Sequence, residues 1–263
     1  MRKAFAGLVV LFAAFCATAH ASDATRQRTE LRLGVDPTYA PFESKAPSGK
    51  LVGLDIDLGN EICRRLKTQC VWVETAFDGI IPALQSRKFD AIMSALSVTK
   101  QREMQIAFSS LLYNTPSRLI GKTGSGLTTT PASLKGKRIG VATGSTQEAY
   151  AKAYWAPAGI DIVSYTNQDL VNADLLLGRI DGTLTDEIVG NDGFLKLHPG
   201  AGFAFLGGDI VDEKTLGKGI AMGLRKDDSG MRQKINAAIA AIMADGTFEK
   251  IERQHFAFDI ASH

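Results

Sequence analysis

The sequence predicts an α/β fold, because short strand-like apolar runs alternate along the chain with segments of helical apolar spacing. The 263-residue chain is 45% hydrophobic and 22% charged, as in an ordinary globular protein. That length suits one large domain or two of about 100–150 residues. Since strands alternate with helices, we expect parallel βαβ units.

The first segment has the pattern of a secretory signal peptide. A short basic region precedes an apolar run at residues 4–15, and Ala19-His20-Ala21 is a small-x-small cleavage sequence. The run is shorter than the roughly 20 apolar residues that a transmembrane helix needs. We therefore expect residues 1–21 to be removed by cleavage after Ala21.

The net charge limits the classes of partner. The chain has 30 Lys and Arg against 28 Asp and Glu, and cleavage removes two basic residues and no acidic one. The mature protein is therefore nearly neutral, and it has no basic run. We expect it to bind neither nucleic acid nor an anionic membrane surface.

Two cysteines remain after cleavage, Cys63 and Cys70, because Cys16 leaves with the signal peptide. In an oxidising compartment they are predicted to form a disulfide, which stabilises by about 2–3 kcal/mol in the chain-entropy model. Two free buried thiols are the alternative. No histidine lies within twenty residues of either cysteine, so we expect no metal site, and nothing indicates a cofactor.

The first elements are predicted in order. Residues 31–35 alternate like a half-buried strand, and residues 71–73 are the next strand. Between them, an amphipathic helix ending at 63–67 is indicated by four apolar residues at roughly helical spacing: Ile56, Leu58, Ile62 and Leu66. The disulfide would therefore tie the end of this helix to the following strand.

The same alternation continues to the end of the chain. The remaining predicted strands are 90–93, 138–142, 160–165, 182–185 and 220–224. The remaining predicted helices are 80–87 (with Pro82 tolerated in its first turn), 99–107, 145–155, 169–178 and 229–244. Residues 121–131, rich in Gly, Ser and Thr, are a surface loop or a linker, and we favour the loop.

A candidate anion site follows the strand at 90–93. The strand leads into the hydroxyl residues Ser94 and Ser97, and a helix begins near Thr99, where free N–H groups attract anions. Arg102 falls in the first helical turn and could clamp a carboxylate with its planar fork. A surface arginine beside a helix cap is the alternative.

A second candidate follows the strand at 138–142. Ser145 and Glu148 have the spacing of a capping box, and Gly144 permits close backbone approach. Thr146 could contact a second side of the same anion. A well-capped helix without a ligand is the alternative, and the P-loop signature is absent.

Acidic and aromatic residues lie at other strand ends. Asp36 and Tyr39 follow the first strand, at the edge where open α/β sheets bind ligands, and Phe77 supplies a second ring. Two rings and an acid suit a flat or cationic group. Asp186, where a strand meets a helix, could receive an ammonium. Core packing for the rings and helix capping for Asp186 are the alternatives.

Catalytic patterns are weak. The chain lacks G-x-S-x-G, H-E-x-x-H and G-x-G-x-x-G. Three histidines remain after cleavage, His198, His255 and His263, and none lies near an obvious partner. We therefore nominate no catalytic residue.

Taken together, the motifs resemble those of periplasmic amino-acid-binding proteins of ABC importers, solute-binding protein family 3. They are most similar to the lysine/arginine/ornithine-binding and histidine-binding group. The resemblance covers essentially the whole mature chain and includes its cysteine pair. Its motifs are GVDPTYAPF at 34–42, GLDIDLGNE at 53–61, FDGIIP at 77–82, GSTQEAY at 144–150 and DGTFEKI at 245–251.

The resemblance implies a two-lobe, type II periplasmic-binding-protein fold that closes on its ligand by a hinge motion. Each lobe would have a central, mostly parallel sheet flanked by helices. Lobe one would comprise 22–113 and 220–263, lobe two 118–210, and the hinge crossings 114–117 and 211–219. This discontinuous layout does not follow from periodicity.

The resemblance also implies roles for single residues. Arg102, helped by Thr146, would bind the ligand α-carboxylate, and Asp186 with Ser97 the α-ammonium. Tyr39 and Phe77 would sandwich the aliphatic side chain, and Asp36 would face its cationic end. The remaining expected ligand-binding residues are Ser94, Ala95, Ala142, Ser145 and Gln147.

Two departures from the group bear on the ligand. Ala95 stands where a serine is usual, and Ala142 where a larger apolar residue is usual. Both leave a roomier or less polar pocket, which favours arginine or a derivatised basic amino acid over histidine.

The implied function is a non-enzymatic, monomeric periplasmic protein that delivers arginine, ornithine or lysine to an inner-membrane ABC permease. Alternatives are an opine-binding protein, a receptor-coupled sensor and an exported dehydratase. The dehydratase would need a free acid in the cleft, for which Glu187 is the one nominee, although we expect it on a helix surface.

Overall fold

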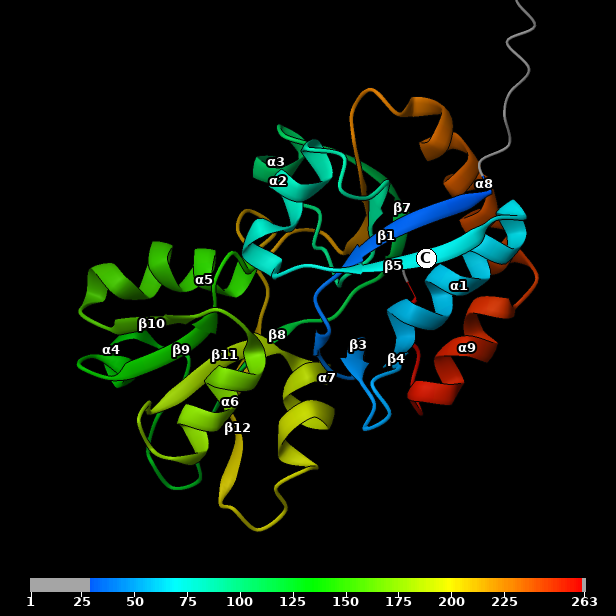
Figure 1. The fold of residues 1–263 in the computed structure, drawn as a ribbon. Helices are drawn as coiled ribbons and strands as arrows, with labels where there is room; N and C mark the ends of the chain where they lie inside the picture. Colours follow the sequence, from blue (N-terminus) through cyan, green and yellow to red (C-terminus); the bar gives the residue numbers. More distant parts are fainter. Residues whose placement is uncertain (1–28, 262–263) are drawn as a thin grey trace, which may run out of the picture.

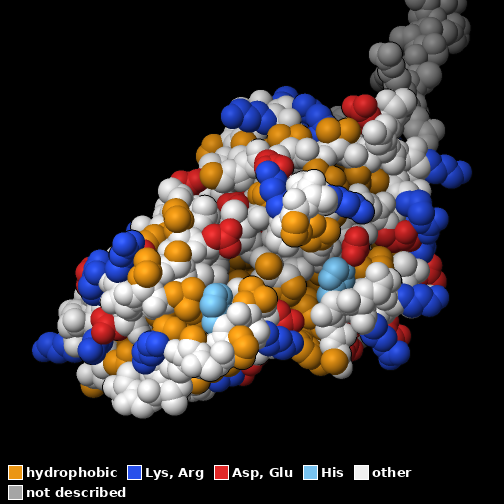
Figure 2. Space-filling view, turned by 60° about the horizontal axis from the view of Figure 1, so that its bottom comes forward, with side chains coloured by type: hydrophobic (Ala, Val, Ile, Leu, Met, Phe, Trp, Pro, Cys, Tyr) orange, Lys and Arg blue, Asp and Glu red, His pale blue; other side chains and the backbone are white. Residues whose placement is uncertain are grey.

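A computed structural model describes residues 29–261, which form two bodies, each built on a five-stranded sheet (Figure 1). The predicted signal peptide lies outside the described residues. Within residues 29–261, no helix is long and apolar enough to cross a membrane. Basic and acidic side chains are interspersed over the face shown in Figure 2.

The first body contains both ends of the described chain. Its sheet has the order β5-β1-β6-β13-β7, in which β13 runs antiparallel to both neighbours and the other four strands share one direction. The strands are β1 (Glu30–Val35), β5 (Gln69–Glu74), β6 (Ala91–Ile92), β7 (Ala107–Tyr113) and β13 (Ile220–Leu224). The helices are α1 (Leu54–Leu66), α2 (Ile80–Gln85), α3 (Lys100–Glu103), α8 (Ser229–Ala244) and α9 (Thr247–His255), and a 3-10 turn (Phe77–Gly79) precedes α2.

The second body repeats this arrangement with the middle of the chain. Its sheet has the order β10-β9-β11-β8-β12, in which β8 is the reversed strand. The strands are β8 (Ser117–Lys122), β9 (Arg138–Ala142), β10 (Asp161–Tyr165), β11 (Gly182–Asp186) and β12 (Phe203–Ile210). The α-helices are α4 (Pro131–Leu134), α5 (Thr146–Tyr150), α6 (Gln168–Leu176) and α7 (Glu187–Gly190), extended by π-helical turns at Ala151–Trp155 and Asn191–Leu195 and a 3-10 turn at Ala156–Ala158.

The chain passes between the bodies twice. It leaves β7 at Tyr113 and enters β8 at Ser117, then leaves β12 at Ile210 and enters β13 at Ile220. The first crossing leads into β8 and the second into β13. Each crossing is therefore followed by the antiparallel strand of the sheet that the chain enters. The mostly parallel sheets expected from the sequence are confirmed, with one reversed strand in each.

A small antiparallel sheet lies between β1 and α1 in the chain. It consists of β2 (Thr38–Tyr39), β3 (Glu43–Lys45) and β4 (Leu51–Val52). No periodicity indicated these strands, because they are two or three residues long. They are important for the site, since they carry Tyr39 and Glu43.

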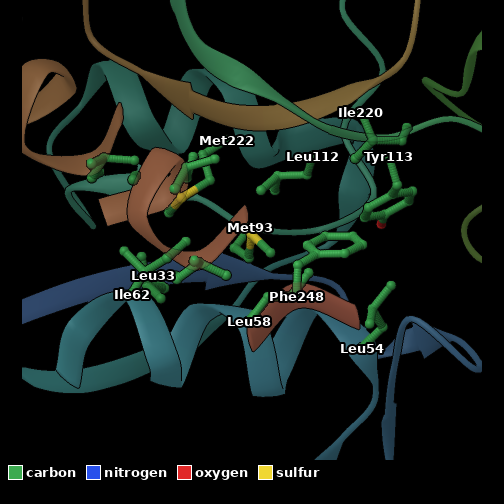
Figure 3. Close-up of a cluster of buried hydrophobic side chains, with 14 of the residues drawn as sticks. Leu33, Leu54, Leu58, Ile62, Met93, Leu112, Tyr113, Ile220, Met222 and Phe248 are labelled. Carbon is green, nitrogen blue, oxygen red and sulfur yellow. The ribbon is translucent and has the colours of Figure 1, made fainter. Parts of the chain in front are cut away.

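The main core of the first body lies between its sheet and helices α1, α8 and α9. Leu33, Ile62 and Met222 have no exposed surface, and burying such a side chain contributes about 1.5–3 kcal/mol (Figure 3). Tyr113 and Ile220 lie at one end of this cluster. The second body has its own core around the buried Trp155.

Most predicted elements are confirmed. The helix predicted at 229–244 matches α8, and the strand predicted at 138–142 matches β9. The predicted disulfide is also present: Cys63 and Cys70, whose Cα atoms are 5.7 Å apart, join α1 to β5. Residues 121–131 lead from β8 to α4 inside the second body, so they form a loop and not a linker between bodies.

The helix predicted at 99–107 is wrong beyond Glu103. Thr99 is its cap, as expected, and its hydroxyl accepts a hydrogen bond from the Arg102 N–H at 3.2 Å. From Ala107 onward the chain is strand β7, which pairs with β13 more than a hundred residues later. This long-range pairing overrides the local helical pattern.

Candidate functional site

A cavity lies between the two bodies, and the space not filled by atoms there is about 580 Å³, including open solvent at its mouth. Its wall comes from both bodies, including strand ends and the small sheet. Eleven of the twelve ligand-binding residues expected from the sequence line it: Asp36, Tyr39, Phe77, Ala95, Ser97, Arg102, Ala142, Ser145, Thr146, Gln147 and Asp186. The twelfth, Ser94, lies behind the wall.

Arg102 is a buried cation without an acidic partner. Its side chain donates hydrogen bonds to the carbonyls of Ser97 at 2.9 Å and Gly144 at 3.0 Å, and it lies 5.4 Å from the centre of the Phe77 ring. No carboxylate within residues 29–261 forms an ion pair with it. Burial lowers the pKa of Arg102 to about 10, so it remains charged at neutral pH. A ligand anion would relieve this unpaired charge.

The start of α5, in the second body, lines the same cavity and contacts Arg102 of the first body. Ser145 caps the helix by accepting from the Glu148 N–H at 3.0 Å, as its spacing predicted. The Glu148 carboxylate, however, accepts from the Gly144 N–H at 2.8 Å, one residue before the position that a capping box implies. These bonds hold the turn whose Gly144 carbonyl meets Arg102, and they leave Thr146 in the cavity wall.

Asp186 caps a helix and is part of the cavity wall. It caps α7, accepting from the Ile188 N–H at 2.9 Å and the Val189 N–H at 3.4 Å, and it also accepts from the Thr115 hydroxyl. It lines the cavity as well. Burial raises the pKa of Asp186 to about 6, against the opposing effect of these hydrogen bonds. Its carboxylate is therefore ionised at neutral pH without a cationic partner in the described chain.

Asp36 is the second acid without a cationic partner within residues 29–261. Its carboxylate accepts from the Thr38 hydroxyl at 2.8 Å and from the Phe77 N–H at 2.9 Å. Burial raises the pKa of Asp36, and these two hydrogen bonds oppose the rise. The same bonds hold the Phe77 turn against the end of β1.

The two rings expected in the site are half-buried and line the cavity. Tyr39 lies on the small sheet, with its ring 6.3 Å from that of Phe42. Phe42 in turn stacks on Tyr113 at 5.0 Å and belongs to the core. Tyr39 and Phe77 both border the cavity, so they are not purely core residues, which was the alternative from the sequence.

Ser94 supports the wall instead of lining it. It is buried, accepts from the Asp36 N–H at 3.0 Å and donates to Glu43 Oε1 at 3.0 Å. The hydroxyl therefore connects two acidic positions of the cavity wall.

Eight further residues line the cavity: Thr38, Phe42, Glu43, Tyr113, Thr166, Asn167, Gln168 and Ile220. The three at 166–168 follow β10, so the rule that ligands bind at carboxyl ends of strands could have found them. Glu43 gave no sequence signal, because only the fold buries it. Glu187, the acid nominated for catalysis, lies outside the wall and pairs with Arg118 at 3.1 Å.

The charges of the wall are unequal. The lining residues include three carboxyls, Asp36, Glu43 and Asp186, and one guanidinium, Arg102. No group of three potential metal ligands occurs within residues 29–261. The cavity therefore suits a small molecule with one anionic group and more than one cationic group.

An interlobe cavity with unpaired charges of both signs, between two α/β bodies joined by two crossings, defines a bilobal solute-binding protein. The chain belongs to the bacterial extracellular solute-binding proteins, family 3, whose profile matches residues 31–258.

Three comparisons illustrate this membership. The chain is 46% identical over 260 residues to the lysine/arginine/ornithine-binding periplasmic protein of Escherichia coli, covering 99% of each chain. It is 50% identical over 231 residues to the histidine-binding periplasmic protein of Salmonella typhimurium, covering 88% of this chain and 89% of that one. An ancestral arginine-binding protein bound to arginine matches with a TM-score of 0.82 at 34% identity, covering 88% of this chain and all of that one.

Proposed function

We propose that this protein captures a basic amino acid, with arginine favoured, and delivers it to an ABC-transporter permease. The observation that carries the proposal is that one cavity contains charges of both signs that form no ion pair among residues 29–261: Arg102 lacks an acid, and Asp36 and Asp186 lack a cation. A basic amino acid has the complementary set of one carboxylate and two cations. The ligands named for the relatives support the same class.

Each ligand group has a proposed place. The α-carboxylate binds Arg102, with help from Thr146, and the α-ammonium binds Asp186, with help from Ser97. The aliphatic stem lies between Tyr39 and Phe77, and its cationic end faces Asp36. Ala95, Ala142, Ser145 and Gln147 complete the wall, and the small size of Ala142 leaves room for a long side chain.

The two bodies are proposed to be lobes that close on the ligand. Lobe one is proposed to comprise 22–113 and 220–263, of which 22–28 and 262–263 lie outside the described residues. Lobe two comprises 118–210, and the crossings at 114–117 and 211–219 form the hinge. Contacts between the bodies support a closing motion, because Arg102 of one donates to Gly144 of the other at 3.0 Å. Closing removes water from the charged groups and strengthens their pairing.

The location, the partner and the non-enzymatic nature of the protein are also proposed. The mature chain begins after Ala21, works in the periplasm as a monomer and meets an inner-membrane permease. It is proposed not to be an enzyme, since the wall carries three carboxyls and one guanidinium, which disfavour an anionic dehydratase substrate. An opine is disfavoured as well, because its additional carboxylate would face those acids.

Calorimetric titration of the refolded, ligand-free mature protein tests the proposal. The panel is arginine, lysine, ornithine, histidine, glutamine, glutamate and octopine. Micromolar or tighter binding of a basic amino acid is expected. Binding of octopine alone would keep the fold but replace the ligand class. No binding at all would contradict the proposal and justify an assay for dehydratase activity.

Gly193→Ala is expected to weaken arginine binding by hindering closure. A Cβ at Gly193, in the second body, would lie 2.7 Å from the Ala40 carbonyl oxygen of the first. Overpacking of this kind costs about 1–3 kcal/mol, or roughly 5- to 150-fold in affinity. The clash lies between the bodies and not inside either core, so the variant can relieve it by opening, and the unfolding midpoint of the ligand-free protein should not fall.

Gly230→Ala is the matched control, because a Cβ there has nothing within 4 Å. It should leave affinity unchanged. A Gly193→Ala protein that binds arginine normally, or that is destabilised without ligand, would show that this contact does not belong to closure.

Arginine affinity is expected to fall as the pH drops below about 6. The ammonium needs an ionised Asp186, whose pKa is raised to about 6, so protons compete with the ligand below that value. Between pH 7 and pH 5 the dissociation constant should rise about tenfold for this one group. Titration with arginine at pH 5, 6 and 7 checks this, because arginine keeps its charges over the range. An unchanged constant would rule out Asp186 as the ammonium partner.

A further inference from the structure

One buried carboxyl of the cavity wall is not used by the proposed ligand contacts. Glu43, on β3, is 1% exposed and lines the cavity. Its Oε1 accepts from the Ser94 hydroxyl at 3.0 Å. Its Oε2 is buried and has no hydrogen-bond partner in the part of the chain that the structure describes.

In the neighbouring acids, by contrast, every carboxylate oxygen accepts a hydrogen bond. Asp55, behind the wall, accepts from the Ala95 N–H and the Tyr113 hydroxyl, each at 2.7 Å, so both of its oxygens are used. The carboxylate oxygens of Asp36 and Asp186 are likewise all hydrogen-bonded. Among these four acids of the described chain, Glu43 alone has an oxygen that accepts no hydrogen bond.

Glu43 lies at the Asp36 end of the cavity. Ser94 connects the two acids, since it accepts from the Asp36 N–H and donates to Glu43, both at 3.0 Å. Ala95, which follows Ser94 in the chain, also lines the cavity and has no hydroxyl to donate. Leaving a buried acceptor without a donor is unfavourable, so a donor from the ligand would be stabilising.

We propose that Glu43 is a ligand contact that, with Asp36, recognises a planar guanidinium in preference to a compact ammonium. This inference rests on the proposed function and names its specificity residue. A guanidinium carries five N–H donors in one plane and can donate to two carboxyls at once. An ammonium is a point charge that Asp36 alone can satisfy.

The raised pKa of Glu43 is consistent with its recognition of a guanidinium. Burial, and then the neighbouring Asp55, Asp36 and Asp186, raise the pKa of Glu43 well above its usual range, and the Ser94 hydrogen bond opposes the rise. The raised pKa favours the protonated form of Glu43 in the empty cavity, and protonation would limit the repulsion among the carboxyls. A guanidinium beside Glu43 would favour the ionised carboxylate and so oppose this rise in its pKa.

The test is Glu43→Gln, titrated with arginine, lysine and citrulline, the neutral isostere of arginine. Arginine affinity should fall about tenfold or more, as expected for losing a hydrogen bond to a charged group. Lysine affinity should change less than about threefold, and so should citrulline affinity, since neither presents a guanidinium charge to this carboxyl. The preference of the wild type for arginine over citrulline should therefore narrow.

Two further variants make the result decisive. Glu252→Gln replaces another buried glutamate whose pKa is raised by burial, but outside the cavity wall, and should not alter the ligand preference. Glu43→Asp withdraws the carboxyl by one methylene and should also lose arginine selectively, which covers a Gln variant that fails to fold.

The outcomes separate the two proposals. A wild-type protein that binds no basic amino acid refutes the proposed function itself. A wild type that binds them, with Glu43 variants that lose arginine and lysine equally or lose neither, overturns the role of Glu43 alone.

Discussion

Arg102→Met is expected to abolish measurable arginine binding while leaving the ligand-free protein folded and no less stable. The variant would bury the ligand carboxylate without a cation, which costs about 3–5 kcal/mol, or roughly two to four orders of magnitude in affinity. Without ligand, Arg102 is a desolvated cation with a pKa lowered to about 10, so its removal relieves a penalty that offsets the two lost hydrogen bonds. Calorimetric titration and thermal unfolding measure the two effects.

Arg225→Met is the matched control, because Arg225 is a buried arginine with acidic partners. It is 6% exposed and pairs with Asp228 at 3.2 Å and Asp90 at 3.6 Å. Its loss should destabilise by about 3–5 kcal/mol and leave the affinity of the folded protein unchanged. If both variants lost stability alike and the Arg102 variant still bound arginine, the assignment of Arg102 to the carboxylate would be wrong.

Asp186→Asn is expected to weaken ligand binding and, in contrast, to stabilise the ligand-free protein. Asparagine can still cap α7 through its side-chain oxygen, so the helix start should persist. The variant loses the negative charge for the ligand ammonium, and we expect binding to weaken at least about a hundredfold. Stability without ligand should rise at neutral pH.

The sign of the stability change follows from the raised pKa. Asp186 titrates at about 6 in the fold against 3.8 as its ordinary value, so the fold loses stability as the pH rises through this window. The difference of about two pKa units corresponds to roughly 3 kcal/mol at pH 7, which asparagine avoids. Chemical unfolding at pH 4 and pH 7 should show the gain at pH 7 alone. A less stable variant at pH 7 would mean that capping outweighs the buried charge.

Both large effects concern charges that the ligand-free fold leaves unmatched. The side chains of Arg102, Asp36 and Asp186 are held in place by hydrogen bonds. None of the three forms an ion pair with another described residue. Such pre-organised but unpaired groups lower the stability of the empty protein and raise its affinity. The ligand supplies the missing partners.

Several features of the fold were predictable because their signals are local. The amphipathic pattern that predicted α8 lies within sixteen residues, and the Thr99 and Ser145 caps depend on residues three positions away. The disulfide joins cysteines separated by seven positions. The resemblance added the two-lobe arrangement, which no periodicity contains.

Long-range contacts explain what the sequence pattern missed. β7 lies where a helix was expected, because it pairs with β13, and the sheet of the first body is complete only after the chain returns. Asp186 had two competing interpretations from sequence, cap and ligand contact. The structure confirms the cap and places Asp186 in the cavity wall, and the ligand contact stays a prediction.

The sequence by itself determined the alternation of strands and helices, the disulfide and the types of charged and aromatic residues at the strand ends. These depend on spacing and chemistry within a few residues. Only the tertiary structure decided which charges remain unpaired, that Ser94 lies behind the wall and that Glu43 is buried with a free oxygen. Burial and pairing depend on groups far apart in the chain, such as Glu43 and Ser94, which meet only when the small sheet packs against the strand ends.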